Sequence, residues 1–481
     1  MKLFFNRSLA VQLAIILSAI NFTQCKKFVE IDAPTTQLVA ASVFDNNSSA
    51  TAAQTVIYSQ MANRAESFSL EFNTGLLGDE LTNYSTNPTN IQFYTDDMTA
   101  LQTSGPWNDA YNYIFQANAI IAALQDNAAI SPAVQQQLTG ESKFIRAFWL
   151  FYLTSLYGDI PLVTSTNYTV NGTIARSPQP KVYQQIISDL VSAEGLLSSN
   201  YIDASDTTTT TERTRPTKWA AAALLARAYL YSGDYTDAKS QAALVIGNTG
   251  LYGLVGIPND SVFKANSLEA IWQLAIPSPN TTAYDVPEGY YFPLTGAPGG
   301  TSSANCCTLS PQLLQSFEPG DKRRTYWVDS LTTISPAMTY YYPYKYQIRT
   351  TANIEYTMVF RLAEEYLIRA EAETQLNDLT DGAADLNVIR NRAGLSNIAD
   401  SISSSQSTMM TAILHERQVE LFTEWGHRWI DLGRSGIGNA VMGAVAPEKN
   451  ATWNPDGYQL LFPIPQSERN VDPNLTQNAG Y

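Results

Sequence analysis

Histidine, cysteine and basic residues are scarce in this sequence. Two histidines, His415 and His427, and three cysteines occur among 481 residues, and no CxxC or HExxH spacing is present. This scarcity argues against a metal site built from histidine and cysteine, and we expect no metal and no cofactor. Acidic residues outnumber Lys and Arg by 44 to 29, which gives a net charge of −15. Nucleic acid is not expected as a partner, because binding it depends on neutralising phosphates.

Long apolar runs are missing after the N-terminus, so we expect no membrane-spanning helix in the body of the protein. The N-terminus itself has the form of an export signal. Lys2 and Arg7 are basic, and residues 9–20 are apolar but too few to span a bilayer. We therefore predict that residues 1–24 are a signal peptide.

A cysteine at the signal boundary predicts a lipid anchor. Cleavage before Cys25 would leave an acylated N-terminus, and two or three acyl chains hold a protein on a membrane durably. Gln24 is larger than the residue that usually precedes such a cysteine, so an ordinary cleavable signal with an incidental cysteine is the alternative. We predict a lipid-anchored tether over residues 25–39 and a single domain over residues 40–481.

Helical periodicity dominates most of this domain. Hydrophobic residues make up 44% of the sequence, which is enough for a large core. Apolar residues recur at intervals of three and four after Trp107, after Pro132 and in residues 182–197, which predicts helices with one buried face. A further long helix is predicted over residues 408–431.

Two segments resemble tetratricopeptide units, in which small residues let two antiparallel helices approach. Residues 360–392 are a looser copy with a longer turn at residues 377–382. We predict helical repeats over about 40–249 and 354–435, which would form a scaffold and specify no chemistry. The clearer copy, residues 218–247, fits the repeat at six positions: Leu225, Ala226, Tyr229, Gly233, Tyr235 and Ala238.

The region between the repeats, residues 250–353, differs in composition. It is rich in Pro, Gly, Thr, Ser and Tyr and contains short strand-like pieces such as residues 270–276. Loops of this kind often contain functional residues, so we expect this insertion to form part of a ligand face. Residues 436–481 are expected to be an irregular tail. The predicted fold is thus mainly α, a tetratricopeptide-like helical scaffold with a loop-rich insertion that contains short strands.

Eight sequence blocks resemble the SusD/RagB family of nutrient-binding lipoproteins of the bacterial outer membrane. They follow the order of the family and extend over almost the whole predicted domain. The blocks are GESKFIRAF (140–148), LYGDIPL (156–162), LARAYL (225–230), LNVIRNRAGL (386–395), HERQVEL (415–421), GHRWIDL (426–432), FPIPQSE (462–468) and NLTQNAGY (474–481).

This resemblance implies a helical body with four tetratricopeptide-like units beneath a loop-rich ligand face. It implies that the protein captures an oligosaccharide at the outer face of the outer membrane. A SusC-like TonB-dependent barrel is the implied partner, over which the protein would act as a lid. The alternatives are a RagB-like protein that binds peptides and a scaffold that binds only the transporter.

A charged segment near the end of the second repeat is expected to be structural. Glu416, Glu420 and Glu424 are spaced by four and share one helical face, followed by Arg428. This pattern suits ion pairs with neighbouring helices. The glycines of residues 433–438 follow a helix and not a strand, so they are not a dinucleotide cradle. We expect a binding protein without enzymatic activity. The enzymatic alternative is a glycoside hydrolase, which needs two carboxylates about 5–10 Å apart in a cleft, an arrangement that a sequence alone does not show.

Two regions offer candidate ligand contacts, because sugars stack on aromatic rings and hydrogen-bond to polar groups. A strand-like alternation in residues 340–346 predicts that about half of its rings are buried. The first region is residues 79–108. The alternative to ligand binding there is a loop held by its own turn hydrogen bonds, with Trp107 in the core. The candidates are Asp79, Asn83, Tyr84, Trp107 and Asn108 in the first region, and Tyr290, Tyr291, Trp327, Tyr341 and Tyr344 in the insertion.

Two short motifs in the insertion have more than one interpretation. Cys306 and Cys307 are adjacent and could form a strained mutual disulfide, but two buried or free thiols are the more ordinary arrangement. Lys322, Arg323 and Arg324 could pair with acidic groups of a ligand, although a run of charges is usually a solvated face.

Overall fold

The computed structural model describes residues 43–98, 104–257, 261–277 and 283–481. The predicted signal peptide, Cys25 and the predicted tether lie outside the described residues. Helices dominate the rest, and the expected mainly α fold is confirmed. Among the described helices, none is long and apolar enough to cross a membrane.

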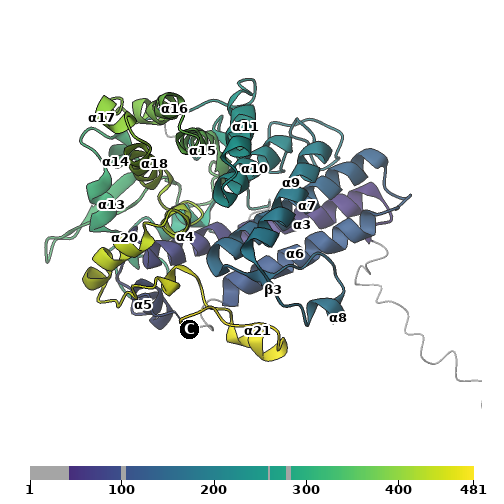
Figure 1. Ribbon diagram of the computed structural model, residues 1–481, viewed down its shortest axis with the longest axis horizontal. Coiled ribbons are helices and arrows are strands. Elements are labelled where there is room, and N and C mark those ends of the chain that lie inside the picture. Colours follow the sequence, from purple (N-terminus) through teal and green to yellow (C-terminus); the bar gives the residue numbers. More distant parts are fainter. Residues whose placement is uncertain (1–42, 99–103, 258–260, 278–282) are drawn as a thin grey trace, which may run out of the picture.

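Five helices form the N-terminal part of an extended helical array (Figure 1). Proline at the first position of α7 starts that helix where its missing N–H costs nothing, and Gly158, at φ +73°, ends it. The guanidinium of Arg146 binds both carboxylate oxygens of Asp189, at 2.8 and 2.6 Å, and so joins α7 to α9. The helices are α3 (Asn47–Asn63), α4 (Glu66–Leu77), α6 (Ser104–Leu124), α7 (Pro132–Tyr157) and α9 (Gln179–Leu196).

Both predicted repeat pairs are present. Helices α10 (Lys218–Ser232) and α11 (Tyr235–Ile246) meet at Gly233, whose φ of +87° suits glycine. Helices α15 (Leu362–Gln375) and α16 (Leu379–Arg392) form the second pair. The turn predicted over residues 377–382 is shorter, since α16 begins at Leu379. Gly382 therefore lies inside α16, where an added Cβ would come within 2.6 Å of Thr374 Oγ1 on α15.

The long helix predicted over residues 408–431 is two helices, α18 (Gln406–Leu421) and α19 (His427–Arg434). The backbone between them turns at Thr423, Trp425 and Gly426, all of which have positive φ. The turn is fixed by buried carboxylates, because Glu80 accepts from Thr423 N at 3.3 Å and Glu71 accepts from Trp425 N at 3.2 Å.

Strands are short and form four antiparallel pairs in the described residues. The pairs are β1 (Leu81–Asn83) with β5 (Cys307–Leu309), β2 (Ile160–Pro161) with β3 (Arg176–Ser177), β4 (Ala270–Leu274) with β8 (Thr357–Arg361), and β6 (Val328–Thr332) with β7 (Thr339–Pro343). Short helices lie between the strands: α5 (Pro88–Tyr94), α8 (Tyr168–Asn171), α12 (Pro287–Tyr291), α13 (Pro311–Ser316) and α14 (Lys322–Tyr326). A further short helix, α17 (Asp400–Ser403), lies between α16 and α18.

The tail is more regular than expected. After α19 the chain forms two α-helices and two 3-10 helices, so the prediction of an irregular tail over residues 436–481 is wrong in part. Proline ends and restarts these short helices, which obscures their periodicity in the sequence. They are α20 (Gly438–Val445), η1 (Ala446–Lys449), η2 (Tyr458–Leu460) and α21 (Gln466–Val471).

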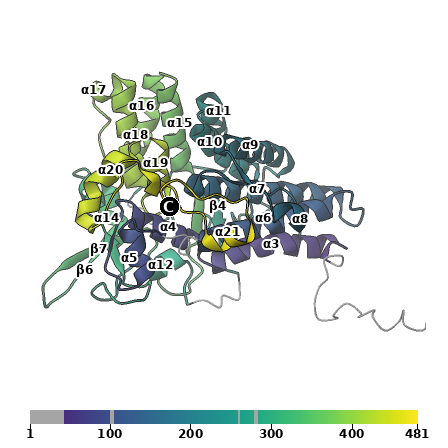
Figure 2. The ribbon, with the colours of Figure 1, turned by 60° about the horizontal axis from the view of Figure 1, so that its bottom comes forward.

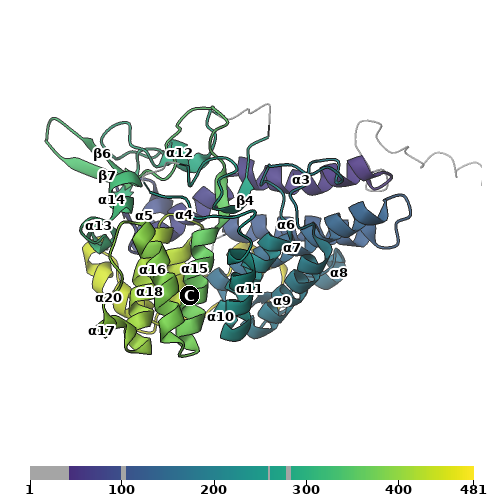
Figure 3. The same cartoon turned by 90° about the horizontal axis from the view of Figure 1, so that it is seen from above.

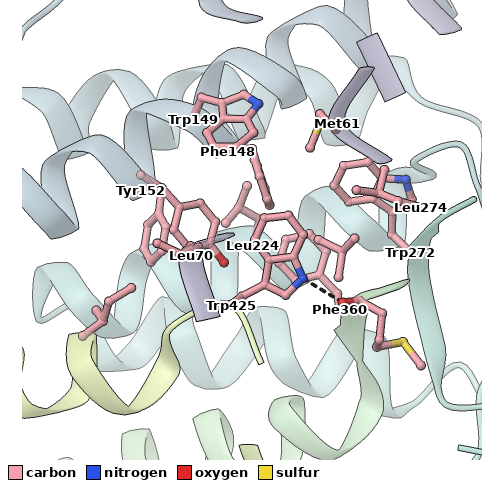
Figure 4. Packing of buried hydrophobic residues seen from close by; sticks show 14 of the residues in the cluster. Met61, Leu70, Phe148, Trp149, Tyr152, Leu224, Trp272, Leu274, Phe360 and Trp425 are labelled. Carbon is pink, nitrogen blue, oxygen red and sulfur yellow. Dashed lines mark hydrogen bonds between the residues drawn. The ribbon is translucent and has the colours of Figure 1, made fainter. Parts of the chain in front are cut away.

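A single aromatic cluster joins the helical array to the insertion (Figure 4). Phe148 on α7 packs edge-to-face against Trp272, Phe360 and Trp425, with ring centroids 5.6, 6.0 and 5.3 Å away. The Trp425 indole donates to Met358 O at 2.7 Å, so its polar atom is satisfied in the core. These contacts hold β4 and β8 against α7.

The repeat helices and the insertion occupy opposite sides of the molecule. In Figure 3 the helices α10, α15, α16 and α18 lie on one side, and the β6–β7 hairpin and α12 lie along the other. Figure 2 shows the same separation from another angle. We call the side formed by the β6–β7 hairpin and α12 the loop face.

Candidate ligand-binding site

The segment after α4 is anchored by a buried ion pair. Asp79 is 4% exposed, and its two oxygens accept from Arg428 Nε at 2.8 Å and Nη2 at 2.6 Å. The neighbouring Glu80 is also buried, and burial together with the Asp79 carboxylate raises the pKa of Glu80 to about 8. Asp79 was predicted as a ligand contact, but its carboxylate is buried and fully used within the protein. Its role in the structure is to fix the start of β1.

Strand β1 then presents Tyr84 at the surface. Tyr84 N donates to Cys306 O at 2.8 Å, which extends the pairing of β1 with β5. Asn83 accepts from Ser85 N at 2.9 Å, so its side chain closes the turn that follows. The expected alternative of a loop held by its own turn hydrogen bonds therefore describes Asn83. The Tyr84 ring is 37% exposed.

The β6–β7 hairpin places further rings beside Tyr84. The Tyr340 ring meets the Tyr84 ring edge-to-face, with centroids 5.6 Å apart. Tyr341 is half-buried, and the Arg324 guanidinium lies over its ring at 4.4 Å. Tyr342 is buried and donates to Asp329 Oδ2 at 2.9 Å. We call Tyr84, Tyr340, Tyr341 and Arg324 the β7 group.

Two other predicted contacts lie near this hairpin. Tyr344 is half-buried and packs edge-to-face against Tyr342, with centroids 6.0 Å apart. Trp327 is only 3% exposed and packs against Phe263 and beneath the Lys345 ammonium, which lies 5.0 Å from its ring. Trp327 is therefore part of the core, although its sequence neighbourhood resembles that of the exposed tyrosines.

A second aromatic group lies on and beside α12. Tyr290 and Tyr291 have ring centroids 5.1 Å apart, and Tyr284 lies 5.2 Å from Tyr290. The Arg349 guanidinium lies 4.8 Å from the Tyr290 ring, and the three rings are half-buried. We call these four residues the α12 group. The β7 group and the α12 group both belong to the loop face (Figure 3).

Buried acids support α12 from below. Glu288 on α12 accepts from Thr357 Oγ1 at 3.2 Å, and burial raises its pKa to about 7. Glu71 on α4 accepts from Ser67 Oγ at 2.5 Å, and burial and Glu288 raise the pKa of Glu71 well above its ordinary value. Because the pKa values of both acids are raised, protonation of at least one of them avoids a pair of unpaired buried charges.

Neither arginine of the two groups was among the candidate ligand contacts, although Arg324 belongs to the basic triplet that could pair with acidic groups of a ligand. Arg324 makes no hydrogen bond or ion pair with any residue that the structure describes, and Arg349 donates to Pro293 O at 2.8 Å. Both guanidiniums instead lie over tyrosine rings. In the sequence, Arg324 is one of three consecutive basic residues, and the sequence does not distinguish it from its neighbour Arg323, which is fully buried in the structure. No pattern in the sequence around Arg349 indicates a ligand contact.

Trp107 and Asn108 lie away from both groups, on α6. Trp107 is 3% exposed and packs against Tyr111 and Tyr157, with both centroids 4.9 Å away. It borders a cavity of about 310 Å³ that is also lined by Phe115 and by residues of α21. Asn108 is exposed. The structure therefore does not bring these two residues together with Tyr84.

The charged row forms the expected ion-pair lattice, although α18 ends at Leu421 and Glu424 lies in the turn after it and not on the same helix. Burial alone would raise the pKa of Glu420, but the arginines around it hold that pKa well below its ordinary value. Arg428, predicted to extend the row, pairs with Asp79 instead. The lattice joins Glu416, Glu420 and Glu424 to Arg323, Lys345, Arg361, Arg390 and Arg392.

One group of side chains has the composition of a metal site. Ligand atoms of Glu318, His415 and Glu416 lie within 4.8 Å of one another. Arg390, however, donates to Glu318 at 2.5 and 3.0 Å and to Glu416 at 3.2 Å. The His415 ring nitrogen lies 2.8 Å from Ser316 O. A guanidinium thus already supplies the positive charge that these carboxylates need.

Comparisons with known proteins agree with this architecture. A family model described as "SusD family" matches residues 326–481, and one described as "Starch-binding associating with outer membrane" matches residues 28–230. SusD-like protein P2 of Formosa agariphila is 27% identical over 426 residues, which cover 78% of this chain and 80% of that protein. A SusD-like protein of Bacteroides ovatus is 26% identical over 490 residues, covering 90% and 83%.

Solved structures share the fold. A SusD superfamily protein from Bacteroides vulgatus superposes with a TM-score of 0.77 at 21% identity, covering 91% of this chain and all of that chain. A laminarin-binding SusD-like protein superposes with a TM-score of 0.73 at 23% identity, covering 91% of this chain and all of that chain. At these identities the similarity shows the fold alone.

Proposed function

Since this chain belongs to the SusD/RagB family of nutrient-binding proteins, we propose that it captures an oligosaccharide on its loop face and delivers it to a SusC-like TonB-dependent barrel. In this proposal the protein is a lipoprotein on the outer face of the outer membrane, anchored through Cys25. It acts as the lid of the barrel and has no enzymatic activity.

The observation that best supports glycan capture is the β7 group. Tyr84 and Tyr340 come from distant parts of the chain and form an aromatic corner at the surface. Sugar rings present apolar faces that stack on such rings, and their hydroxyls need donors and acceptors at the edge. Arg324 and the hydroxyls of the tyrosines supply these groups. In this proposal the α12 group is a second contact along the same glycan.

Asp79, Trp107 and Trp327 are left out of the proposed site because each is buried. The proposed contacts are Tyr84, Tyr340, Tyr341 and Arg324, with Asn83 and Tyr344 as neighbours, and Tyr284, Tyr290, Tyr291 and Arg349 at α12. Asn108, which is exposed on α6, is left out because no described contact joins it to these residues.

Two experiments test the proposal. Binding of the purified protein to a glycan panel that includes laminarin tests capture, and laminarin comes first because a protein of this fold is described as binding it. Co-purification of the full-length lipoprotein with a TonB-dependent barrel from its native membrane tests the partner. Binding to peptide pools and not to glycans would contradict the oligosaccharide proposal. Association with the barrel and binding to no ligand would leave only a scaffold.

A further inference from the structure

An apolar groove of about 310 Å³ lies between α6 and α21, with α8 beside it (Figure 1). Phe115 on α6 and Val471 on α21 line the groove and are 50% and 75% exposed. Large apolar side chains that line one groove and stay exposed to this degree indicate a surface that something covers. We call it the α6–α21 groove. Its apolar lining also includes Trp107, Tyr111, Pro161, Val163 and Leu475.

Hydrogen bonds fix the walls of the groove. Tyr111 Oη donates to Pro161 O at 2.8 Å, which joins α6 to the chain that follows α7. Asn474 Nδ2 donates to Thr173 O at 2.7 Å, which holds the end of the chain beside α8. The groove is therefore already formed in the protein and does not depend on an occupant for its shape.

Two carboxylates line the groove without a cationic partner. Glu468 accepts from Ser467 Oγ at 3.3 Å, and Asp472 accepts from Asn474 N at 2.9 Å. Neither carboxylate forms an ion pair with any residue that the structure describes, although Asp472 is only 7% exposed. An apolar surface with two unpaired carboxylates favours an occupant that combines apolar and cationic side chains.

The predicted tether contains a segment of this kind directly after Cys25. Residues 26–29 are Lys-Lys-Phe-Val, and the next basic residue of the chain is Arg64. This segment lies outside the described residues. The match to the starch-binding family model begins at residue 28, so the sequence pattern of the family extends into the predicted tether.

The segment is long enough to reach the groove. The chain enters the described domain at the C-terminal end of α6, where Asn127 Nδ2 donates to Phe44 O at 3.0 Å. At 1.5 Å per residue, Phe115 lies about 14 Å along α6 from this end, and the far end of the groove lies about 26 Å from it. Residues 30–42 span up to about 45 Å when extended. Residues 26–29 can therefore reach every part of the groove.

We propose that residues 26–29 bind in the α6–α21 groove of their own molecule. Phe28 covers the exposed side chains of Phe115 and Val471. The ammonium groups of the two lysines pair with the two carboxylates of the groove. The occupant thus supplies both the apolar surface and the positive charge that the groove lacks.

This binding fixes how the body of the protein is held at the membrane. Cys25 directly precedes the segment, so the α6–α21 side of the body lies next to the acyl chains while the segment is bound. When the segment is released, the body can move up to about 60 Å from the anchor, which is the extended length of residues 26–42. This consequence rests on the proposed lipid anchor, but the binding in the groove does not.

Zero-length cross-linking tests the proposal. The mature full-length protein in detergent is treated with a carbodiimide, which joins an amine to a carboxylate in contact with it. The monomer is isolated, digested and analysed by mass spectrometry. The expected product joins a lysine of residues 26–27 to Glu468 or Asp472.

Three variants show whether the apolar contact holds the lysines in place. Phe28→Gln keeps both lysines and leaves the described domain unaltered, and we expect it to reduce the yield of this product roughly tenfold. Phe115→Gln, on the groove side, should have the same effect. Leu244→Gln, at a residue of α11 that is 49% exposed, is the matched control and should cross-link like wild type.

A wild-type monomer without this product would overturn the proposal, as would equal yields in wild type and in both phenylalanine variants. Lysines joined at similar yield to carboxylates outside the groove would indicate an unbound tether and would also contradict it. A product found only in a cross-linked dimer would assign the groove to the segment of a second copy, which again overturns the proposal. None of these results depends on acylation or on a ligand, so the test stays informative if the proposed function fails.

Discussion

The rings of Tyr84 and Tyr340 meet edge-to-face at 89°, with centroids 5.6 Å apart, although one follows β1 and the other lies in β7. Strand β5 joins them, because it pairs with β1 and also packs against β7. The loop near the N-terminus and the insertion therefore form one surface. This contact is the reason for placing glycan capture at the β7 group.

Arg324 should contribute to affinity for acidic glycans. The guanidinium has no carboxylate partner among the described residues and lies over the ring of Tyr341, a residue of the proposed site. We expect Arg324→Gln to weaken binding of a uronate-containing glycan by roughly tenfold, the worth of one charge-assisted hydrogen bond, and to affect a neutral glycan less. Calorimetry with both glycans measures the difference. Arg64→Gln, at an exposed arginine on the helical array, is the matched control and should change neither affinity.

Removing Arg361 should destabilise the protein strongly. Arg361 Nε donates to Glu424 at 2.8 Å, Nη1 binds Glu420, and all three side chains are buried. Arg361→Met would leave two buried carboxylates with less positive charge, and we expect a loss of about 3–5 kcal/mol in the free energy of unfolding. Arg64→Met, which breaks an exposed pair with Asp109, should cost about 0–1 kcal/mol. Equal losses in urea denaturation would contradict this account of the lattice.

Stability should fall as pH rises from 6.5 to 8. Burial raises the pKa of Glu66 and Glu288 to about 7 and that of Glu80 to about 8, so the folded state holds protons that the unfolded state has released. His427, whose pKa burial lowers, opposes this trend only below about pH 6.5. Lys345, with its pKa lowered to about 8, reverses the trend only at higher pH.

Denaturant unfolding at several pH values measures this slope. Each such proton contributes up to about 1.4 kcal/mol per pH unit. Glu80→Gln removes one of the acids and should make the slope less steep. A free energy of unfolding that is constant or increases between pH 6.5 and 8 would contradict the assignment of raised pKa values.

Cys25→Ala should release the protein from the membrane without unfolding it. The substitution removes the predicted acylation site, while the described domain begins well after it. Membrane fractionation measures release, and circular dichroism of the released protein measures folding. Wild-type and variant proteins that are released equally would show that Cys25 is not an anchor.

The helical scaffold could be predicted because its signals are local. Helix α7 has proline at its start and glycine at its end, and Gly233 marks the first repeat turn. The break between α18 and α19 could not be predicted, because it depends on Glu71 and Glu80, which are distant in sequence. The tail was obscured for a different, local reason, because proline interrupts its short helices.

The candidate site could be predicted only in part, since exposure is a tertiary property. Tyr341 and Trp327 are both aromatic residues of the insertion, yet only Trp327 is enclosed by Lys345 and Phe263. Carboxylates such as that of Asp79 often bind sugar hydroxyls, but the Asp79 carboxylate is paired with Arg428, which is distant in the sequence. Sequence periodicity contains neither fact.

The central claim is that Tyr84 and Tyr340 form the glycan-binding surface, and calorimetric titration of the best-bound glycan tests it most directly. Each ring that stacks on the sugar should contribute about 1 kcal/mol to the binding free energy. The Tyr84→Ala/Tyr340→Ala double variant should therefore bind roughly 30-fold more weakly than wild type. Its melting temperature should be unchanged. Tyr168→Ala, at a ring that is 83% exposed on α8, should bind like wild type. Equal affinity of the double variant and wild type would contradict the account.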